Sequence, residues 1–295
     1  MKEAFAQKTL QAASQKTVTV VNAILAEYEA DEYDLTLRQL YYQMVARGYV
    51  ENSQRSYKCL GDLVNNARLV GLIDWDMIKD RGRETICPPH WDSPADIINA
   101  AAQSFALDKW EDQPHYIEVM VEKQALEGVL IPVCNALDIR FTANKGYSSS
   151  SALYETGKRL KESADAGKCV WLLYLGDHDP SGMDMTRDID DRTRLFSGVP
   201  VEVNRLALNM DQIRELAPPE NPAKTTDSRS EAYIRRFGTS SWELDAIEPR
   251  MLASLVTEAV EGLRDAALWE TAVAREKVMR AELTGFAQDY ARRAG

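Results

Sequence analysis

The sequence predicts a mixed α/β protein in which a helical front part is followed by a parallel β-sheet. Short apolar runs rich in β-branched and aromatic residues alternate with helical patterns in the middle of the chain. The order strand, helix, strand, helix, strand favours parallel pairing with crossover helices. The predicted strands are Tyr116–Val121, Ile139–Thr142, Cys169–Leu175 and Val201–Leu208.

The front part is predicted to consist of three helices and a wing. A helix is expected over Lys2–Glu29. The next, Thr36–Gly48, opens on a good N-cap and stops at a glycine. The third predicted helix, which is also amphipathic, covers Ser53–Val70. The segment Leu72–Ile78 is predicted to form a short wing-like strand region. Two helices and a wing are typical of a winged-helix variant of the helix-turn-helix.

Prolines between Cys87 and Pro94 indicate a linker between two domains, residues 1–90 and 95–295. After it, Asp96–Leu107 is a predicted helix that leads into the sheet. Beyond Leu208 the chain is expected to be irregular up to Trp242. The predicted helices of the tail are Pro249–Leu263 and Ala266–Arg292, which close the core or contribute to a dimer contact.

Three acidic residues follow predicted strands. Asp177 and Asp179 come after Cys169–Leu175, with Gly182 behind them, and Glu122 follows Tyr116–Val121. Ligand sites in open α/β sheets collect at the carboxyl ends of strands. Carboxylates held close together repel unless a cation neutralises them, and oxygen ligands suit Mg²⁺. By itself an Asp-x-Asp pair more often caps a turn, and Glu122 is equally compatible with an ordinary acid at the start of a helix. A lone imidazole such as His178 is expected to face solvent.

These motifs resemble the TOPRIM domain of topoisomerases, primases and several nucleases. Val121-Glu-Lys123, Lys145-Gly-Tyr147 and Gly176-Asp-His-Asp-Pro-Ser-Gly182 are similar to the TOPRIM of type IIB topoisomerase (topoisomerase VI) A subunits and their meiotic double-strand-break relatives. The resemblance implies a Rossmann-like TOPRIM domain that binds Mg²⁺ through Glu122, Asp177 and Asp179. Where that family continues with Pro-Asp after the tyrosine, this chain has Ser148–Ser151, which are expected to cap the next helix.

The same family carries its nucleophile in an upstream winged-helix domain. Arg38-Gln-Leu-Tyr-Tyr42 resembles the family signature, with Gln39 in place of its acid. The resemblance makes Tyr42 the attacking residue and Arg38 its companion. Residues four apart share a helix face, so Arg38 can approach both the Tyr42 oxygen and a phosphate. Both tyrosines of such a pair are, however, often packing residues.

Composition and charge limit the class of protein. No apolar stretch approaches the length of a membrane span and no export signal precedes the first helix, so we expect a cytoplasmic protein. Four widely spaced cysteines and three histidines favour neither a zinc site nor a disulfide framework. The net charge of −11 is unusual for a DNA-binding protein.

Basic residues nevertheless gather in two places. The winged-helix candidate contains Arg38, Arg47, Arg55, Lys58, Arg68, Lys79, Arg81 and Arg83. The second group is Lys224, Arg229, Arg235 and Arg236, read either as the flank of a groove or as a solvated face. We therefore expect weak affinity for double-stranded DNA at physiological salt, with a partner contributing to binding.

The predicted function is Mg²⁺-dependent DNA cleavage by tyrosine transesterification, as in a type IIB topoisomerase A subunit. The resemblance implies a homodimer in which Tyr42 of one protomer attacks beside the acids of the other and leaves a 5′-phosphotyrosyl link. ATP use would require a separate GHKL-type ATPase B subunit, since no nucleotide-binding loop occurs here. The alternatives are a TOPRIM nuclease that uses activated water, with Tyr42 structural, and a non-catalytic winged-helix DNA-binding protein.

Overall fold

The structure is a computed structural model that describes residues 2–31, 33, 35–79 and 88–294. It confirms a mixed α/β protein with a parallel sheet. The sheet has four strands in the order β2-β1-β3-β4, all parallel. The strands are β1 (His115–Val121), β2 (Arg140–Ala143), β3 (Cys169–Leu175) and β4 (Glu202–Ala207).

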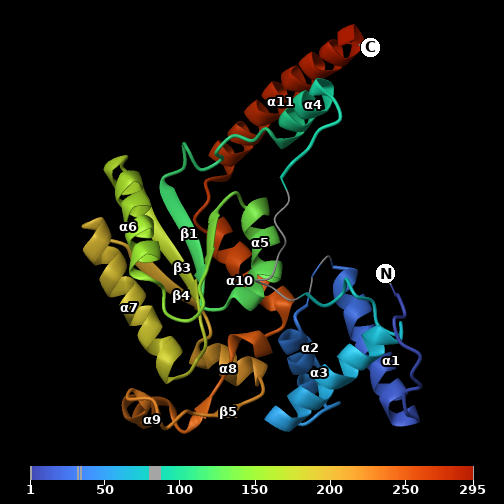
Figure 1. The fold of residues 1–295 in the computed structure, drawn as a ribbon. Coiled ribbons are helices and arrows are strands. Elements are labelled where there is room, and N and C mark those ends of the chain that lie inside the picture. Colours follow the sequence, from blue (N-terminus) through green and yellow to red (C-terminus); the bar gives the residue numbers. More distant parts are fainter. Residues whose placement is uncertain (1, 32, 34, 80–87, 295) are drawn as a thin grey trace.

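Helices cover both faces of this sheet (Figure 1). One face is covered by α6 (Ser150–Asp165) and α7 (Pro180–Ser197), the other by α5 (Glu127–Ala136) and α10 (Pro249–Glu261). Successive residues of a strand point to opposite faces. Met120 and Tyr174 therefore belong to the core under α6 and α7, whereas Val121 and Leu175 belong to the core under α5 and α10.

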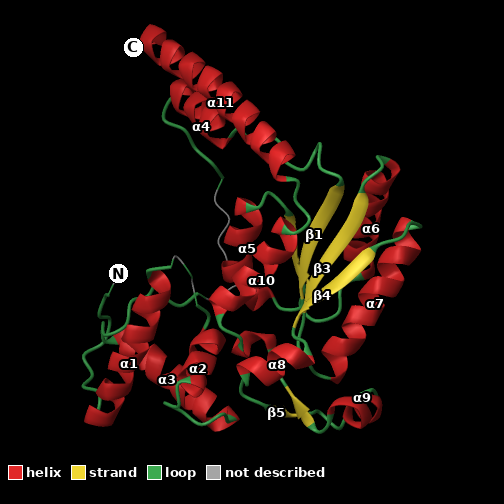
Figure 2. Ribbon diagram, turned by 180° about the vertical axis from the view of Figure 1, so that it is seen from behind, coloured by secondary structure: helices red, strands yellow, loops and turns green. Residues whose placement is uncertain are grey.

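The front part forms a separate helical lobe beside the sheet (Figures 1 and 2). It contains α1 (Ala12–Glu29), α2 (Leu37–Ala46) and α3 (Gln54–Leu69) around its own apolar cluster. Thr36 caps α2 through a capping box, as its position predicts. Ala246 of the short helix η2 (Leu244–Ala246) joins this cluster and connects the lobe to the rest of the chain.

Two expectations for the front part differ from the structure. The first helix begins at Ala12 rather than Lys2, because the leading residues run along the end of α3, where the amides of Phe5 and Ala6 donate to Leu69 O. The expected wing strand is a series of turns with one β-bridge, between Leu35 and Ile78. Arg81, Arg83 and the start of the predicted linker at Cys87 lie outside the described residues.

The segment after β4 is more ordered than predicted. It contains α8 (Met210–Leu216), α9 (Ser230–Phe237) and a small antiparallel pair of β5 (Asn221–Pro222) and β6 (Ser240–Ser241). The expectation of irregular chain was wrong, because α8 and α9 are too short to give a strong periodic signal. This segment lies below the carboxyl edge of the sheet, where it meets the helical lobe (Figure 2).

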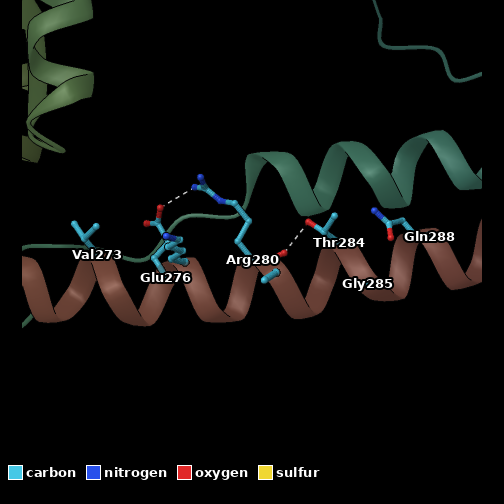
Figure 3. A pocket seen from close by; sticks show the side chains of 8 residues that line it. Val273, Glu276, Arg280, Thr284, Gly285 and Gln288 are labelled. Carbon is cyan, nitrogen blue, oxygen red and sulfur yellow. Dashed lines mark hydrogen bonds and ion pairs between the residues drawn. The ribbon is translucent and has the colours of Figure 1, made fainter.

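The remaining helices form an arm that projects from the sheet. Its members are α4 (Pro94–Ser104) and α11 (Ala266–Ala294), which lie side by side (Figures 1 and 2). Midway along α11, Arg280 pairs with Glu276 (Figure 3). It also donates to Phe105 O, just after the end of α4. Within the described part of the chain, no helix is both long and apolar enough to cross a lipid bilayer.

Candidate functional site

The three predicted acids meet at the carboxyl edge of the sheet. Glu122 follows β1 directly, and its Oε2 accepts a hydrogen bond of 2.8 Å from the Asp177 amide. Asp179 caps α7 by accepting a bond of 2.6 Å from the Gly182 amide. The parallel register aligns the strand ends, since Val121 pairs with Leu175. The sheet therefore positions all three acids through residues adjacent in sequence.

Glycine allows the acid loop to fold this tightly. A Cβ on Gly182 would lie 2.2 Å from Asp177 O and 3.1 Å from Glu122 Oε2. A Cβ on Gly176 would lie 2.9 Å from the same carboxylate oxygen. The contact at Gly182 is with the backbone and is too short for any side chain, so the loop requires glycine there, whereas a side chain at Gly176 would push against the Glu122 carboxylate itself.

The acids open onto a cleft of about 500 Å³ between the sheet edge and the helical lobe. Its acidic lining is Glu122, Asp177, Asp179, Glu243 and Asp245. Its basic lining is Arg38, Lys123, Lys145 and Lys224. The cleft therefore contains cations beside carboxylates, the combination that phosphate binding next to a metal ion requires.

Glu243 and Asp245 reach the cleft through long-range pairing that the sequence did not reveal. The backbones of His178 and Trp242 exchange hydrogen bonds, 2.9 Å from His178 N to Trp242 O and 3.0 Å in return. The Leu244 amide then donates to Asp177 Oδ1 at 2.7 Å. These bonds fix the segment that carries both acids against the Asp177 loop.

Lys123 is the central cation of the cleft. Its Nζ lies 2.8 Å from Asp177 Oδ2, 3.0 Å from Glu243 Oε2 and 3.3 Å from Asp245 Oδ2. Burial by itself would lower the pKa of Lys123, but these carboxylates raise it above its usual value. The ammonium is therefore fully charged and neutralises part of the acidic cluster.

Arg38 is held by Glu243 rather than by its helix neighbour. It projects from α2 into the cleft, forms a close ion pair with Glu243, and its Nε lies 3.5 Å from Asp245 Oδ2. Gln39, at the position of the family's acid, instead completes the capping box by accepting a bond from the Thr36 amide. The acid that orients Arg38 is thus Glu243, which lies 205 residues later in the chain.

Tyr42 does not line the cleft but contacts Asn221, which does. Its side chain is only 3% exposed, and its hydroxyl accepts a long hydrogen bond of 3.5 Å from Asn221, a lining residue. The Arg38 guanidinium stands over its ring, 5.7 Å from the centroid. Burial raises the pKa of Tyr42, and Glu243 adds to the rise. Tyr41 is also buried, and its hydroxyl bonds to Asn52 and Ser53.

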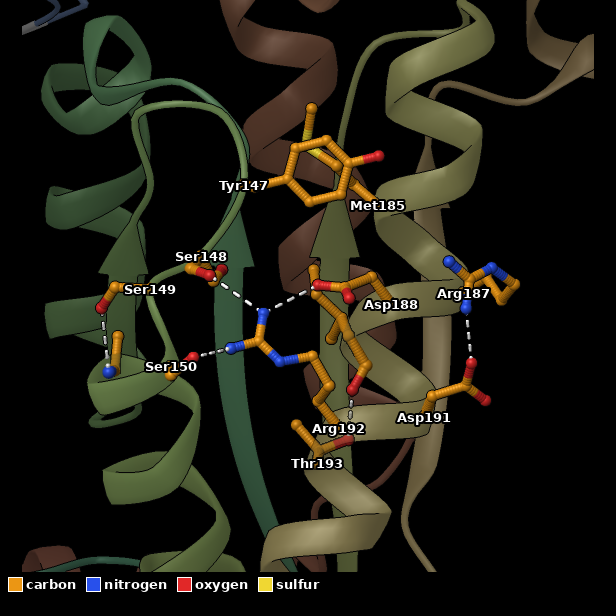
Figure 4. A network of polar contacts seen from close by, with 12 residues as sticks. Tyr147, Ser148, Ser149, Ser150, Met185, Arg187, Asp188, Asp191, Arg192 and Thr193 are labelled. Atoms are coloured by element: carbon orange, nitrogen blue, oxygen red, sulfur yellow. Dashed lines mark hydrogen bonds and ion pairs between the residues drawn. The ribbon is translucent and has the colours of Figure 1, made fainter. Parts of the chain in front are cut away.

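The loop after β2 is fixed to α7 and to the loop before α9. Tyr147 donates to Asp184 at 2.6 Å, and Arg229 binds both of these side chains. Ser149 caps α6, as predicted for the serines, while Arg192 binds Ser148 O and Ser150 Oγ (Figure 4). Lys145 forms a β-bridge with Lys123 and lines the cleft.

His178 does not face solvent, and that expectation was wrong. It is 1% exposed, stacks edge-on against Tyr233, Phe237 and Trp242, and its Nδ1 lies 2.8 Å from the Tyr233 hydroxyl. Burial lowers its pKa to about 4, so the ring is neutral at pH 7. Because alternate residues of an extended segment point in opposite directions, His178 enters the core while its neighbours face the cleft.

Arg205 of β4 is a positioning residue that the sequence reasoning missed. Its guanidinium donates to Gly176 O at 2.8 Å, Asp177 O at 2.6 Å and Gly182 O at 3.2 Å. It therefore ties both ends of the acid loop together beneath the carboxylates. An arginine near the end of a predicted strand was the available signal, because a charged residue that the sheet covers needs internal partners.

The donor set fits a hard divalent cation. All the acidic side chains offer oxygen ligands. Burial, reinforced by the Asp177 charge, raises the pKa of Glu122 to about 7, and burial also raises the pKa of Asp177. This is the behaviour of neighbouring buried carboxylates that have too little positive charge around them. Over the described residues, no three Asp, Glu, His or Cys side chains already stand in a metal-enclosing arrangement, so the carboxylates would have to move inward around an ion.

Much of the predicted basic surface is occupied internally. Arg47 pairs with Glu27, Arg68 donates to the carbonyls of Trp75 and Ile78, and Arg229 pairs with Asp227. Exposed basic residues that remain near the lobe or the cleft include Arg55, Lys58, Lys145 and Lys224.

No known protein family, curated protein or solved structure matches this chain. The arrangement of side chains in the cleft is therefore the basis for any assignment of function.

Proposed function

We propose that this chain is a TOPRIM-type, Mg²⁺-dependent DNA-cleaving protein with an N-terminal winged-helix domain, similar to a type IIB topoisomerase A subunit. One observation carries the proposal: Glu122, Asp177 and Asp179 line a single cleft that also contains four basic side chains. Mg²⁺ bound by the three acids would stabilise negative charge on a phosphate. Arg38, Lys145 and Lys224 would bind the neighbouring phosphates of double-stranded DNA.

In the transesterification route, the Tyr42 oxygen attacks the phosphorus and the bond to the 3′-oxygen breaks. The phenol gives up its proton to water, and the departing 3′-oxygen takes one up, so the number of protons is unchanged. The products are a 5′-phosphotyrosyl link and a 3′-hydroxyl. Arg38 supports this route, because it contacts the Tyr42 ring and reaches the cleft from the same helix. Attack requires the phenol to be uncovered, by movement of Asn221 or by pairing of two protomers.

Hydrolysis by water is the second candidate, and the burial of Tyr42 favours it. A side chain that is 3% exposed, with a raised pKa, is a poor nucleophile in this conformation. In that case the metal site cleaves DNA alone, and Tyr42 supports α2 as a packing residue.

Plasmid cleavage separates the two routes. With Mg²⁺, transesterification gives a denaturant-resistant protein–DNA adduct at broken 5′ ends, and Tyr42→Phe loses both the adduct and the nicking of supercoiled DNA. If Tyr42→Phe nicks at the wild-type rate, Tyr42 is not the nucleophile. Asp177→Asn should abolish cleavage in either route while DNA association, followed by fluorescence anisotropy, persists. Asp211→Asn, the same change at a side chain that is 94% exposed, is the control.

A mixing experiment tests the proposed homodimer. Heterodimers of Tyr42→Phe and Asp177→Asn chains contain one intact site if tyrosine and acids meet across two protomers. They contain none if the residues act within one chain. Restored cleavage on mixing supports the partner arrangement, and continued inactivity under conditions where heterodimers form contradicts it.

If Asp177→Asn cleaves as fast as the wild type, the metal-dependent enzyme is excluded. If the wild-type protein binds DNA but does not cleave it, the remaining candidate function is that of a non-catalytic winged-helix DNA-binding protein.

A further inference from the structure

Asp245 is a buried acid whose carboxylate is incompletely satisfied. The residue is 2% exposed and lines the cleft. Neither of its oxygens accepts a hydrogen bond, although Oδ2 is within ion-pair distance of Lys123 and Arg38. Within the described ranges, it is the one carboxylate buried in this way. A buried charge without hydrogen bonds is costly, so its presence calls for a ligand.

The surroundings of Asp245 define where such a ligand would sit. Oxygens of Asp177, Glu243 and Asp245 converge on the Lys123 ammonium at distances between 2.8 and 3.3 Å. Asp177 carries a hydrogen bond from the Leu244 amide on its other oxygen, which fixes the direction of the carboxylate. Three acidic groups from two chain segments thus surround one position that a cation already occupies.

We propose that Asp245, Glu243 and Asp177 form a second divalent-cation site, at which Mg²⁺ or Mn²⁺ takes the place of the Lys123 ammonium. This site is distinct from the Glu122, Asp177 and Asp179 set and shares only Asp177 with it. The inference rests on the proposed function in one respect, namely that Asp177 is a metal ligand.

Charge and ligand chemistry both support this site. Among the residues that the structure describes, the three carboxylates pair with two monovalent cations, Lys123 and Arg38, and a divalent ion would supply the missing positive charge. Carboxylate oxygens lie about 2.0–2.1 Å from Mg²⁺, closer than to an ammonium, so the acids need to close by about 1 Å. The Lys123 side chain is partly exposed and has a flexible stem, which allows it to withdraw into the open part of the cleft.

Displacement of Lys123 would also place its charge where a phosphate enters. Lys145 lies next to Lys123 through their β-bridge, so both ammonium groups would then face the open cleft. Filling the second site would thereby couple metal binding to the binding of the DNA backbone.

Mn²⁺ titration of the full-length, DNA-free protein tests the inference, with isothermal calorimetry for stoichiometry and electron paramagnetic resonance for bound ion. The wild type should bind two ions. Asp245→Asn should keep the ion held by Glu122, Asp177 and Asp179, and its affinity for the second ion should be weaker by about 100-fold. Lys123→Met should tighten the second ion by about tenfold or more, since its competitor is gone. Asp211→Asn should match the wild type.

Unchanged stoichiometry and affinity in Asp245→Asn, or no tightening in Lys123→Met, would overturn the second site and leave Lys123 as a permanent counter-ion. Should Asp245→Asn fail to fold by thermal melting, Glu243→Gln replaces it, because that side chain is 25% exposed and less dependent on packing. Asp179→Asn keeps the two proposals separate. It should remove the other ion, so its failure to do so counts against the proposed function and not against Asp245.

Discussion

Replacement of Arg205 by methionine should destabilise the protein strongly, because Arg205 hydrogen-bonds to the backbone of the loop that carries the acids. Its guanidinium donates five hydrogen bonds, to the carbonyls of Gly176, Asp177, Gly182 and Leu208 and to Thr186 Oγ1. Methionine fills most of the volume of the arginine stem, so the loss is mainly that of these bonds.

The magnitude follows from the bonds that cannot be replaced. A hydrogen bond from a charged donor contributes about 1.5–3 kcal/mol, and such bonds are not additive. If half of the five interactions are lost at full strength, the free energy of unfolding falls by about 4–7 kcal/mol. This is a large share of the roughly 5–15 kcal/mol that stabilises a typical protein.

Urea denaturation followed by circular dichroism measures this loss. Arg214→Met is the matched control, because that side chain is 71% exposed and pairs only with exposed Asp211. We expect no measurable change in the control. A loss below about 1 kcal/mol in Arg205→Met would refute the conclusion that Arg205 holds the acid loop.

Three further predictions concern the cleft. The folded-state pKa of Glu122, about 7, exceeds the ordinary 4.5, so the folded protein binds the extra proton and its stability falls as pH rises from about 4.5 to 7. The loss of stability amounts to about 3 kcal/mol in the metal-free protein. Thermal melts in EDTA should show this loss for the wild type and not for Glu122→Gln, so parallel pH profiles of the two proteins would contradict the prediction. Gly182→Ala should lower both melting temperature and Mn²⁺ affinity through the clash with Asp177 O, whereas Gly285→Ala, with open space around it, should raise the melting temperature slightly; equal melting shifts would exclude the clash. Lys224→Gln should reduce the slope of log affinity for DNA against log salt by about 0.9, and an unchanged slope places Lys224 away from phosphate.

Local sequence patterns were sufficient to predict the sheet and the positions of Glu122 and Asp177. Apolar runs of strand length identified all four strands to within one or two residues, and parallel pairing aligned their ends. Glu122 is the first residue after β1 and Asp177 the second after β3, so a local pattern was sufficient to bring them together. The boundaries of α2 were equally local, because Thr36 caps the helix.

The side chains that surround those acids follow from contacts between distant segments. Glu243 and Asp245 enter the cleft through the pairing of Trp242 with His178, a contact between distant segments that no periodicity encodes. The same pairing buries His178 and provides the acid that holds Arg38. Helical periodicity showed that Arg38 and Tyr42 share a face, but not that the Tyr42 ring packs into the core of the helical lobe or that its hydroxyl accepts a bond from Asn221, at a sequence separation of 179. Local propensity fixes elements and their ends, whereas the partners of a buried charge are fixed by packing across the whole chain.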